Sequence, residues 1–230
     1  MPNFSGIWNL KEQVQAVAAG RWTGLPTGEL YVWGLNTSGQ IGDVTTTSKS
    51  SPIQVGSLTN WSQVGAGSSH TAAVKLDGTL WTWGNNGYGR LGDGTTVNKS
   101  SPVQIGALTG WSQVAAGTLH TASVKIDNTL WTWGYNGRGQ LGDGTTANKS
   151  SPVQVGALTN WARAAAGGGQ TVSVKTDGTL WTWGYNHLGQ LGDGTTANKS
   201  SPVQIGALTN WTQVAAGNAH TAAIFQGSSN

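Results

Sequence analysis

The stretch from Trp111 to Gly134 reads WSQVAAGTLHTASVKIDNTLWTWG, and it decides the fold because close copies of it recur along the chain. Sliding the 230-residue sequence by 50 positions superposes Trp61, Trp111, Trp161 and Trp211 without a gap. The copies are near-identical toward the C-terminus. Repeats of about 40 to 50 residues are typical of β-propellers and of helical arrays, so the unit, written about four times, narrows the fold to these two.

Strand signals favour the propeller. Residues 120–125 (HTASVK) and 129–133 (TLWTW) alternate in side-chain character with period two, and a short turn separates them. We expect a hairpin with a tight primed turn, in which Asp77-Gly78 and Asp177-Gly178 supply positive φ angles. A later run, SPVQ, carries a proline, which is tolerated in an edge strand. Four short strands per unit predict one blade of an all-β propeller.

Composition excludes several partners. Charged residues make up only 9% of the chain, while 36 glycines and 13 tryptophans indicate structural roles for both residue types. The net charge of +3 is spread over single residues, without a basic stripe that could follow a nucleic-acid backbone. There is no cysteine, so disulfides and zinc–cysteine sites are excluded. We also expect no membrane span and no cleaved signal peptide, because neither apolar pattern is present.

Two segments of the repeat carry a family resemblance. W-T-W-G-x-N-x-x-G-Q-L-G-D-G and A-A-G-x-x-H-T-A-A-V resemble the repeat of the regulator of chromosome condensation family over residues 30–225. The resemblance implies a β-propeller, commonly of seven blades, that binds proteins. In the founding member the implied roles are GTPase nucleotide exchange and chromatin docking, and in a secreted bacterial relative β-lactamase inhibition. Four units cannot supply seven blades. This difference makes the founding member's function a weaker expectation for this chain than the propeller fold.

The ends of the repeat domain suggest how a ring could close. The chain enters the repeat at residues 30–34 and leaves it after residues 220–225, so residues 31–230 span four units of 50. The last unit ends with the two strands that precede residues 30–34 in a complete blade. We therefore expect a propeller of about four blades, closed by pairing the C-terminal hairpin with residues 30–34. The alternative is an open arc completed by a second subunit.

Residues 1–29 form an extension before the propeller domain of residues 30–230. Asn9 and Glu12 have capping-box spacing, which predicts a short helix over residues 10–19, although the VAAG sequence at 17–20 also fits a relic of a repeat strand. Residues 4–22 are similar to the leader of repeat proteins encoded by marine and cyanobacterial bacteriophages. That resemblance implies an anchor in a virus particle, with these candidate residues: Phe4, Ile7, Trp8, Leu10, Val14, Val17 and Trp22.

Motifs that resemble catalytic or ligand sites have structural explanations. Residues 87–92 and 137–142 fit the G-x-G-x-x-G dinucleotide pattern, but Asp-Gly-Thr-Thr follows instead of a helix, so we interpret them as turns. The lysines of the loops are interpreted as solvated charges: Lys49, Lys99, Lys149 and Lys199. The sequence offers no nucleophile with a base and no paired carboxylates. We expect no catalytic residue, no cofactor and no metal.

Three further repeat positions have both a structural and a ligand-binding interpretation. His70, His120 and His220 share a position with Gln170, a poor metal ligand, so we expect a tie between neighbouring strands. The aspartates that open the Asp-Gly-Thr-Thr loops are expected to form Asx-turns, with calcium as the alternative. The paired tryptophans, such as Trp81 and Trp83, are expected to stack between blades, with a sugar-binding platform as the alternative.

The copies differ in two loops, and these suggest a function. The loop after Trp-Gly and the loop before the histidine position should emerge on one face if the strands alternate in direction. A face that varies on a constant scaffold is typical of a binding surface. Neutral drift at exposed positions is an equally good explanation of the variation. The candidate binding residues are Asn85, Tyr88, Tyr135, Arg138, Tyr185, His187 and Leu188. We expect a non-enzymatic interaction protein of a bacteriophage virion, either capsid decoration or tail fibre, with virion proteins, itself or a host glycan or receptor as partner. The alternatives are a cytoplasmic protein-binding propeller, acting as an enzyme inhibitor or exchange factor, and a carbohydrate-binding module.

Overall fold

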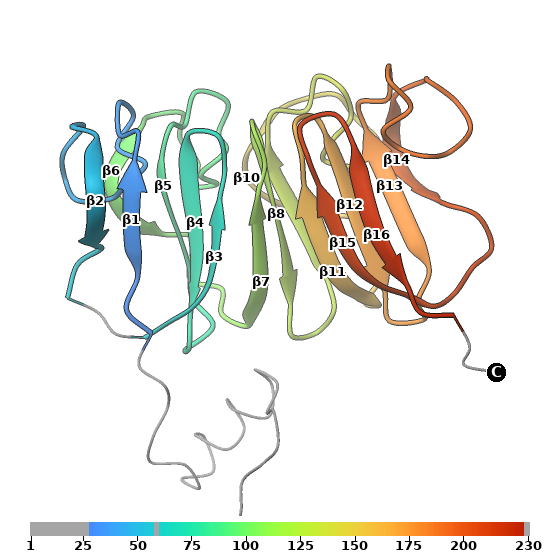
Figure 1. Cartoon of the computed structure of the whole chain (residues 1–230), viewed down its shortest axis with the longest axis horizontal. Coiled ribbons are helices and arrows are strands. Elements are labelled where there is room, and N and C mark those ends of the chain that lie inside the picture. The colour runs from blue at the N-terminus through green and yellow to red at the C-terminus, as the bar shows by residue number, and fades with distance from the viewer. Residues whose placement is uncertain (1–27, 58–59, 228–230) are drawn as a thin grey trace, which may run out of the picture.

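The computed structural model describes residues 28–57 and 60–227, and all regular elements in these ranges are β-strands (Figure 1). The predicted helix at 10–19 and the candidate anchor residues lie outside them. No helix long and apolar enough to cross a membrane occurs in the described ranges. The strands are β1 (Tyr31–Gly34), β2 (Lys49–Gln54), β3 (Trp61–Ala66), β4 (His70–Lys75), β5 (Leu80–Gly84), β6 (Lys99–Gln104), β7 (Trp111–Ala116), β8 (His120–Lys125), β9 (Leu130–Gly134), β10 (Lys149–Gln154), β11 (Trp161–Ala166), β12 (Gln170–Lys175), β13 (Leu180–Gly184), β14 (Lys199–Gln204), β15 (Trp211–Ala216) and β16 (Thr221–Phe225).

The strands form a row of propeller blades. Three antiparallel four-stranded sheets, β3–β6, β7–β10 and β11–β14, each correspond to one full blade. A two-stranded sheet lies at each end: β1–β2 has the outer half of a blade, and β15–β16 has the inner half. The prediction of an all-β propeller with four strands per unit is therefore confirmed.

The hairpin turn differs from the predicted one. In the β4–β5 hairpin the amide of Gly78 donates to the carbonyl of Lys75 at 2.9 Å, and the amide of Lys75 donates to the carbonyl of Thr79 at 3.0 Å. Gly78 has a φ of 76°, but Asp77 is not among the residues with positive φ. The prediction of a primed turn was wrong because a type I turn followed by one left-handed residue closes the loop. The carboxylate of Asp77 instead accepts a hydrogen bond from the amide of Thr79 at 2.9 Å.

The proline-bearing strand is the outer edge of each blade, as predicted. In β6, Lys99 pairs with Gly84 and Val103 pairs with Thr82, so the register shifts between the two pairs. Pro102 lies within this irregular stretch rather than at the start of the strand. The missing amide hydrogen of proline therefore costs no regular ladder hydrogen bond.

Tryptophans pack between the blades. Trp111 on β7 lies 6.1 Å from Trp133 on β9, measured between ring centroids, and both are buried. They pack with Val74 and Leu80 of the preceding blade in one core cluster. The expectation that tryptophans stack between blades is confirmed, and the large aromatic area compensates for a sequence with few long aliphatic side chains.

The ring is not closed within one chain. β1 and β16 belong to separate sheets, and Figure 1 shows them apart, at the two ends of an arc. The prediction that the C-terminal hairpin pairs with residues 30–34 was wrong. The physical reason lies between the blades, where the carbonyl of Gln40 accepts hydrogen bonds from Thr71 Oγ1 at 2.7 Å and from Trp83 Nε1 at 3.0 Å. These bonds hold each blade against the next in the open arc, in which the sheets of β1 and β16 stay separate.

Candidate interaction face

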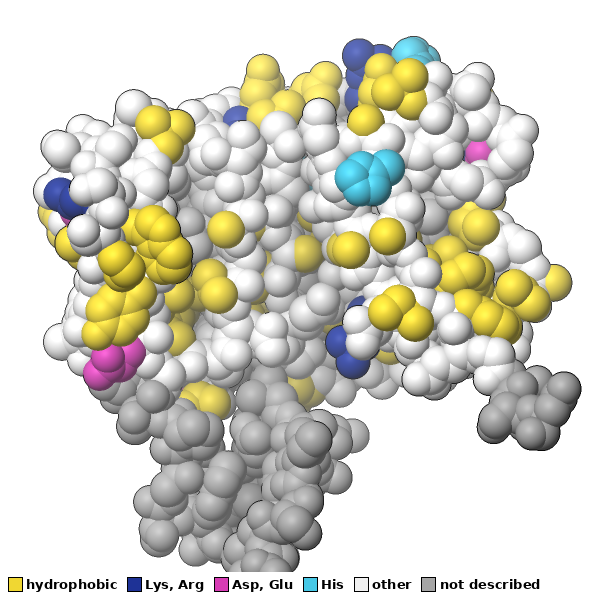
Figure 2. Space-filling view, in the orientation of Figure 1, with side chains coloured by type: hydrophobic (Ala, Val, Ile, Leu, Met, Phe, Trp, Pro, Cys, Tyr) yellow, Lys and Arg dark blue, Asp and Glu magenta, His cyan; other side chains and the backbone are white. Residues whose placement is uncertain are grey.

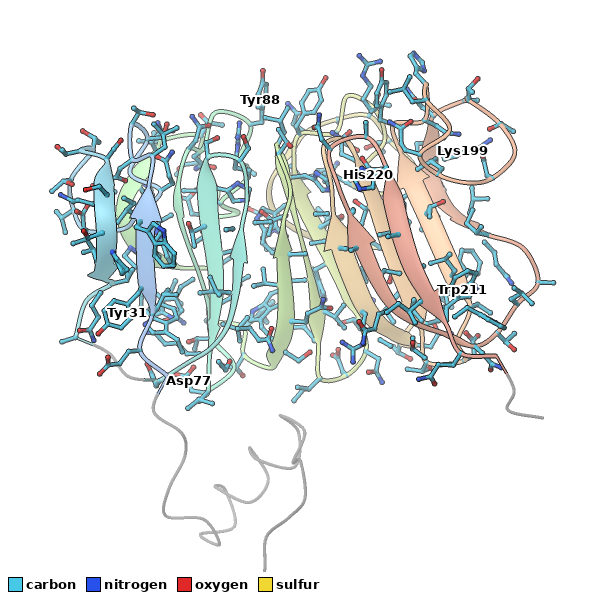
Figure 3. The ribbon with its side chains drawn as sticks, viewed as in Figure 1. Tyr31, Asp77, Tyr88, Lys199, Trp211 and His220 are labelled. Carbon is cyan, nitrogen blue, oxygen red and sulfur yellow. The ribbon has the colours of Figure 1, made fainter. Side chains whose placement is uncertain are left out.

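The two variable loops of each unit meet at one end of the blades, as the alternating strand directions predict. The amide of Asn85 donates to the carbonyl of Ser69 at 2.8 Å, and Tyr185 makes the same bond to Gly169 at 2.8 Å. In Figure 3, Tyr88 lies at this end and Asp77 lies at the opposite end. We call the surface formed by residues 35–38, 85–88, 135–138 and 185–188, together with the adjoining loops before the histidine position, the interaction face.

A buried asparagine organises the constant part of each long loop. Asn86 is fully buried, and its Nδ2 donates to Asp93 Oδ1 and to the carbonyl of Thr95, each at 3.0 Å. Its Oδ1 accepts from the amide of Leu91 at 3.0 Å. The same pattern recurs at the equivalent positions Asn36, Asn136 and Asn186. Sequence reasoning missed these residues, although their invariance among the copies was a visible signal.

The loop aspartates form Asx-turns and also ion pairs. Asp43 Oδ1 accepts from the amide of Thr45 at 3.0 Å, which confirms the predicted turn. Its Oδ2 lies 3.1 Å from Lys49 Nζ, and each of the other three loop lysines pairs with its aspartate in the same way. Interpreting the lysines only as solvated charges was therefore wrong. Burial alone would raise the pKa of Asp43, but hydrogen bonds from Thr45 and Lys49 outweigh it and lower the pKa to about 2.

The variable side chains of three units form a row that contains two stacked contacts across blade boundaries. The rings of Tyr88 and Tyr135 are 5.0 Å apart between centroids. The guanidinium carbon of Arg138 lies 4.8 Å from the ring centroid of Tyr185, whose ring is 4.9 Å from that of His187. The structure thus brings together candidates that lie on separate loops. Leu188, on the same loop as Tyr185, is 72% exposed, and Asn85 Nδ2 donates to Ser38 Oγ at 3.4 Å.

Arg90 supports this row from below and was not predicted. The other units carry glutamine here, and Gln140 Oε1 accepts from the amide of Arg138 at 2.9 Å. Arg90 is buried, and its Nη1 donates to Ser69 Oγ at 3.2 Å and to the carbonyl of Thr118 at 3.0 Å. Its Cζ lies 5.7 Å from the ring centroid of Tyr88. Burial lowers the pKa of Arg90 from its usual value. The single departure from glutamine among the copies was the available signal.

The histidine position ties each blade to the next, which confirms the structural interpretation. His70 Nε2 lies 2.9 Å from Thr121 Oγ1, and that hydroxyl donates to the carbonyl of Arg90 at 2.7 Å. The hydroxyl proton is thus committed, so His70 donates through Nε2–H, and its buried Nδ1 is left bare. Burial lowers the pKa of His70 to about 3 and that of His120 to about 4, and the positive charges of Arg90 and His120 act further on His70. No group of three or more metal-ligating side chains occurs in residues 28–57 and 60–227.

The tryptophan pairs are covered. Trp83 is fully buried, and Lys75 Nζ lies 3.6 Å from the ring centroid of Trp81. A sugar needs a free aromatic face on which to stack; Trp83 offers none, and Lys75 covers one face of the partly buried Trp81. The paired tryptophans therefore belong to the packing between blades.

A family model identifies the repeat. The model of the regulator of chromosome condensation (RCC1) repeat matches residues 27–74, 77–124, 127–174 and 177–224. The chain belongs to the RCC1 repeat family. A second RCC1 repeat model matches residues 61–90 and 111–140. The comparison with curated protein sequences found no significant match.

Several solved structures resemble this chain in fold. Human WBSCR16 superposes with a TM-score of 0.79 and 24% identity, covering 88% of this chain and 55% of that one. Yeast RCC1 (Prp20), in a structure bound to Kap60, gives a TM-score of 0.74 and 19% identity over 87% of this chain and 51% of that one. Prp20p from Saccharomyces cerevisiae, described with its binding properties to Gsp1p and histones, gives 0.73 and 22% over 87% and 53%. The RCC1-repeat chain spans about half the length of these solved relatives.

Proposed function

We propose that this RCC1-repeat chain is a non-enzymatic binding module whose interaction face recognises a protein partner. The observation that carries the proposal is the row of Tyr88, Tyr135, Arg138 and Tyr185 on an otherwise constant scaffold. Tyrosine and arginine dominate the binding energy of many protein interfaces, where they act as rigid anchors that exclude water.

The contacts within the row also favour binding over neutral drift. Tyr88 and Tyr135 come from different blades and pack on each other, and Arg138 and Tyr185 do the same across the next boundary. Side chains ordered before binding lose less conformational entropy when a partner arrives. Drift at exposed positions has no reason to produce stacked pairs across two successive blade boundaries.

The test compares two triple variants in a pull-down from a lysate of the source cells. Changing Tyr88→Ala, Arg138→Ala and Tyr185→Ala together should abolish capture of the partner, since hot-spot truncations each weaken binding about tenfold or more. The matched control changes Leu108→Ala, Ile126→Ala and Leu158→Ala, three exposed apolar residues on loops at the opposite end of the blades. If the first variant captures the same proteins as the parent, the assignment of the face is wrong.

For the biological setting we propose a bacteriophage particle, in which residues 1–29 anchor the chain and the interaction face points outward. The support is the leader resemblance of residues 4–22 together with the low charge and the absence of cysteine. Mass spectrometry of purified particles should detect the chain, and a chain lacking residues 1–29 should fail to incorporate. Normal incorporation of the shortened chain would refute the anchor.

A second candidate is a cellular module that inhibits an enzyme or promotes nucleotide exchange. It is favoured by the likeness to Prp20p, whose structural report names Gsp1p and histones as binding partners. Purified Gsp1p and histones are therefore suitable probes in a direct binding assay with this chain. A glycan array tests the carbohydrate alternative with the same two triple variants.

A further inference from the structure

The two half-blades expose side chains whose counterparts are buried in every full blade. Trp33 on β1 is 60% exposed, whereas Trp83 on β5 is fully buried, as are its equivalents Trp133 and Trp183. On β16, Ile224 is 54% exposed, whereas the equivalent Val74 is fully buried. Figure 2 shows the corresponding apolar patches over β1 at one end and around β15–β16 at the other. Within the described residues, each end thus has a strand edge and an apolar surface without a partner.

In the last full blade, β11–β14, the space that a tryptophan of the next blade fills elsewhere in the arc is open. A Cβ atom added to Gly42 or Gly142 would lie 2.6 Å from the indole nitrogen of the next blade's tryptophan, Trp83 or Trp183 respectively. At the equivalent Gly192 the nearest atom is 3.9 Å away and belongs to Ile205 of the same blade. By its position in the repeat, Trp33 is the tryptophan that would fill the space beside Gly192.

Two further contacts between blades are missing close to Gly192. A Cβ on Gly139 would lie 2.5 Å from Ser200 Cα of the next blade, but nothing lies within 4 Å at the equivalent Gly189. At the internal boundary of Arg90 the carbonyl accepts from Thr121 Oγ1 and Trp133 Nε1 has no partner, whereas the carbonyls of Gln40 and Gln140 each accept from a threonine and a tryptophan. The carbonyl of Gln190 accepts only from Thr221 Oγ1 in the described residues. Gly189, Gly192 and Gln190 each lack a contact that the β1–β2 half-blade could supply.

We infer that two copies of this chain close into one ring of eight blades, in which β15–β16 of one copy and β1–β2 of the other form a composite blade. The β4–β5 pair gives the register: His70 lies opposite Gly84, Thr71 opposite Trp83 and Ala72 opposite Thr82. Transferred by whole repeats, this register places His220 opposite Gly34, Thr221 opposite Trp33 and Ala222 opposite Val32. The inference concerns assembly and goes beyond the proposed binding function.

The curvature of the arc selects a second copy rather than closure within one chain. A four-blade ring requires a turn of about 90° per blade, whereas rings of seven or eight blades require about 51° or 45°. The arc superposes on slightly more than half of human WBSCR16 with a TM-score of 0.79, so its blades turn as they do in a larger ring. Closure within one chain would break the bonds between blades, such as that from His70 to Thr121.

The resulting seam repeats the chemistry of the internal blade boundaries. His220 would bond Thr71 Oγ1 of the second copy as His70 bonds Thr121, and Trp33 Nε1 would donate to the carbonyl of Gln190. The two-fold axis forms the same seam twice, so the ring closes and leaves no open strand edge. The two ends of the chain carry complementary half-blades, so a second copy supplies the missing half of each composite blade.

The first test is the mass of the full chain in solution. Light scattering during size-exclusion chromatography should give twice the 23.7 kDa of the chain. Trp33→Ala should weaken the dimer about tenfold or more, because a large aromatic anchor is lost at each seam. Leu158→Ala, an exposed residue in the middle of the arc, is the control and should leave the mass unchanged. A parent chain that stays monomeric at high concentration would overturn the inference.

The second test uses cysteines, since the parent has none. Directly opposed residues of an antiparallel pair lie within the range that a disulfide can bridge. A Val32→Cys chain mixed with an Ala222→Cys chain should give a covalent dimer of the two on a non-reducing gel. A chain carrying both changes should also run as a dimer. An oxidised monomer of the double variant would show closure within one chain, and either that result or the absence of any cross-link would refute the inference.

Discussion

The buried histidines make the stability of this protein sensitive to mild acid. His70 and His120 each donate through Nε2–H to a threonine of the next blade, and their buried Nδ1 atoms have no hydrogen-bond partner. A proton added to Nδ1 would therefore place an unsatisfied charge in the core. The perturbation that tests this reasoning is His70→Gln together with His120→Gln, because Gln170 occupies the same position in the third full blade and bonds the neighbouring carbonyl of Gly217 at 2.9 Å.

The magnitude follows from the lowered pKa values. Folding lowers the pKa of His70 from 6.5 to about 3 and that of His120 from 6.5 to about 4. The unfolded chain thus binds more protons below about pH 6.5, so stability is full above that pH and falls as the pH drops toward the folded values. At about pH 5, each histidine removes about 2 kcal/mol of stability. The two together should cost about 4 kcal/mol relative to neutral pH.

Urea unfolding, followed by tryptophan fluorescence at one protein concentration, measures the effect. The parent should lose about 4 kcal/mol between about pH 7.5 and about pH 5, and the double glutamine variant should lose little. The loop carboxylates do not interfere, because Asp43 and Asp193 change charge only below about pH 4. His187→Gln, at an exposed position, is the control and should behave as the parent does. Equal losses in the parent and the double variant would refute the reasoning.

Three further predictions concern packing and charge, all measured by urea unfolding at neutral pH. Trp133→Ala should destabilise the chain by about 3 to 5 kcal/mol, since it empties a core site between blades; a loss below 1 kcal/mol would contradict the packing. Gly142→Ala should cost about 2 to 4 kcal/mol, because φ is +70° and the new Cβ meets Trp183; an unchanged midpoint would argue against that contact. Lys99→Ala should cost less than about 1 kcal/mol, as expected for a partly exposed ion pair; a larger loss would mean that Asp93 depends on it.

Strands were predictable because each is decided by its own residues. Residues 120–125 alternate with period two, and β8 has the same bounds, His120–Lys125. The tryptophan stacking was also predictable, since a chain with few large aliphatic residues must bury its aromatics. The joining of the two variable loops on one face followed from the alternation of strand direction alone.

The curvature and the polar contacts were not predictable. The rotation between blades depends on hydrogen bonds such as Thr71 to the carbonyl of Gln40, and no local pattern encodes them. The pairing of Lys49 with Asp43 needs the loop to fold back, which the sequence around either residue does not reveal. Arg90 acts through residues of two other loops, so its role appears only when these loops are placed in space.

The carbonyl that joins each blade to the next has an evolutionary consequence. The residue at that position is glutamine or arginine, yet this contact uses only its main-chain oxygen, so the same hydrogen bond forms with either side chain. Residues 141–160 and 191–210 are nearly identical, so unequal recombination between such copies inserts or deletes one whole blade in register. Each product has the same boundary chemistry as its parent. The number of blades is therefore a trait that can change in single genetic steps, with the fold of every blade preserved.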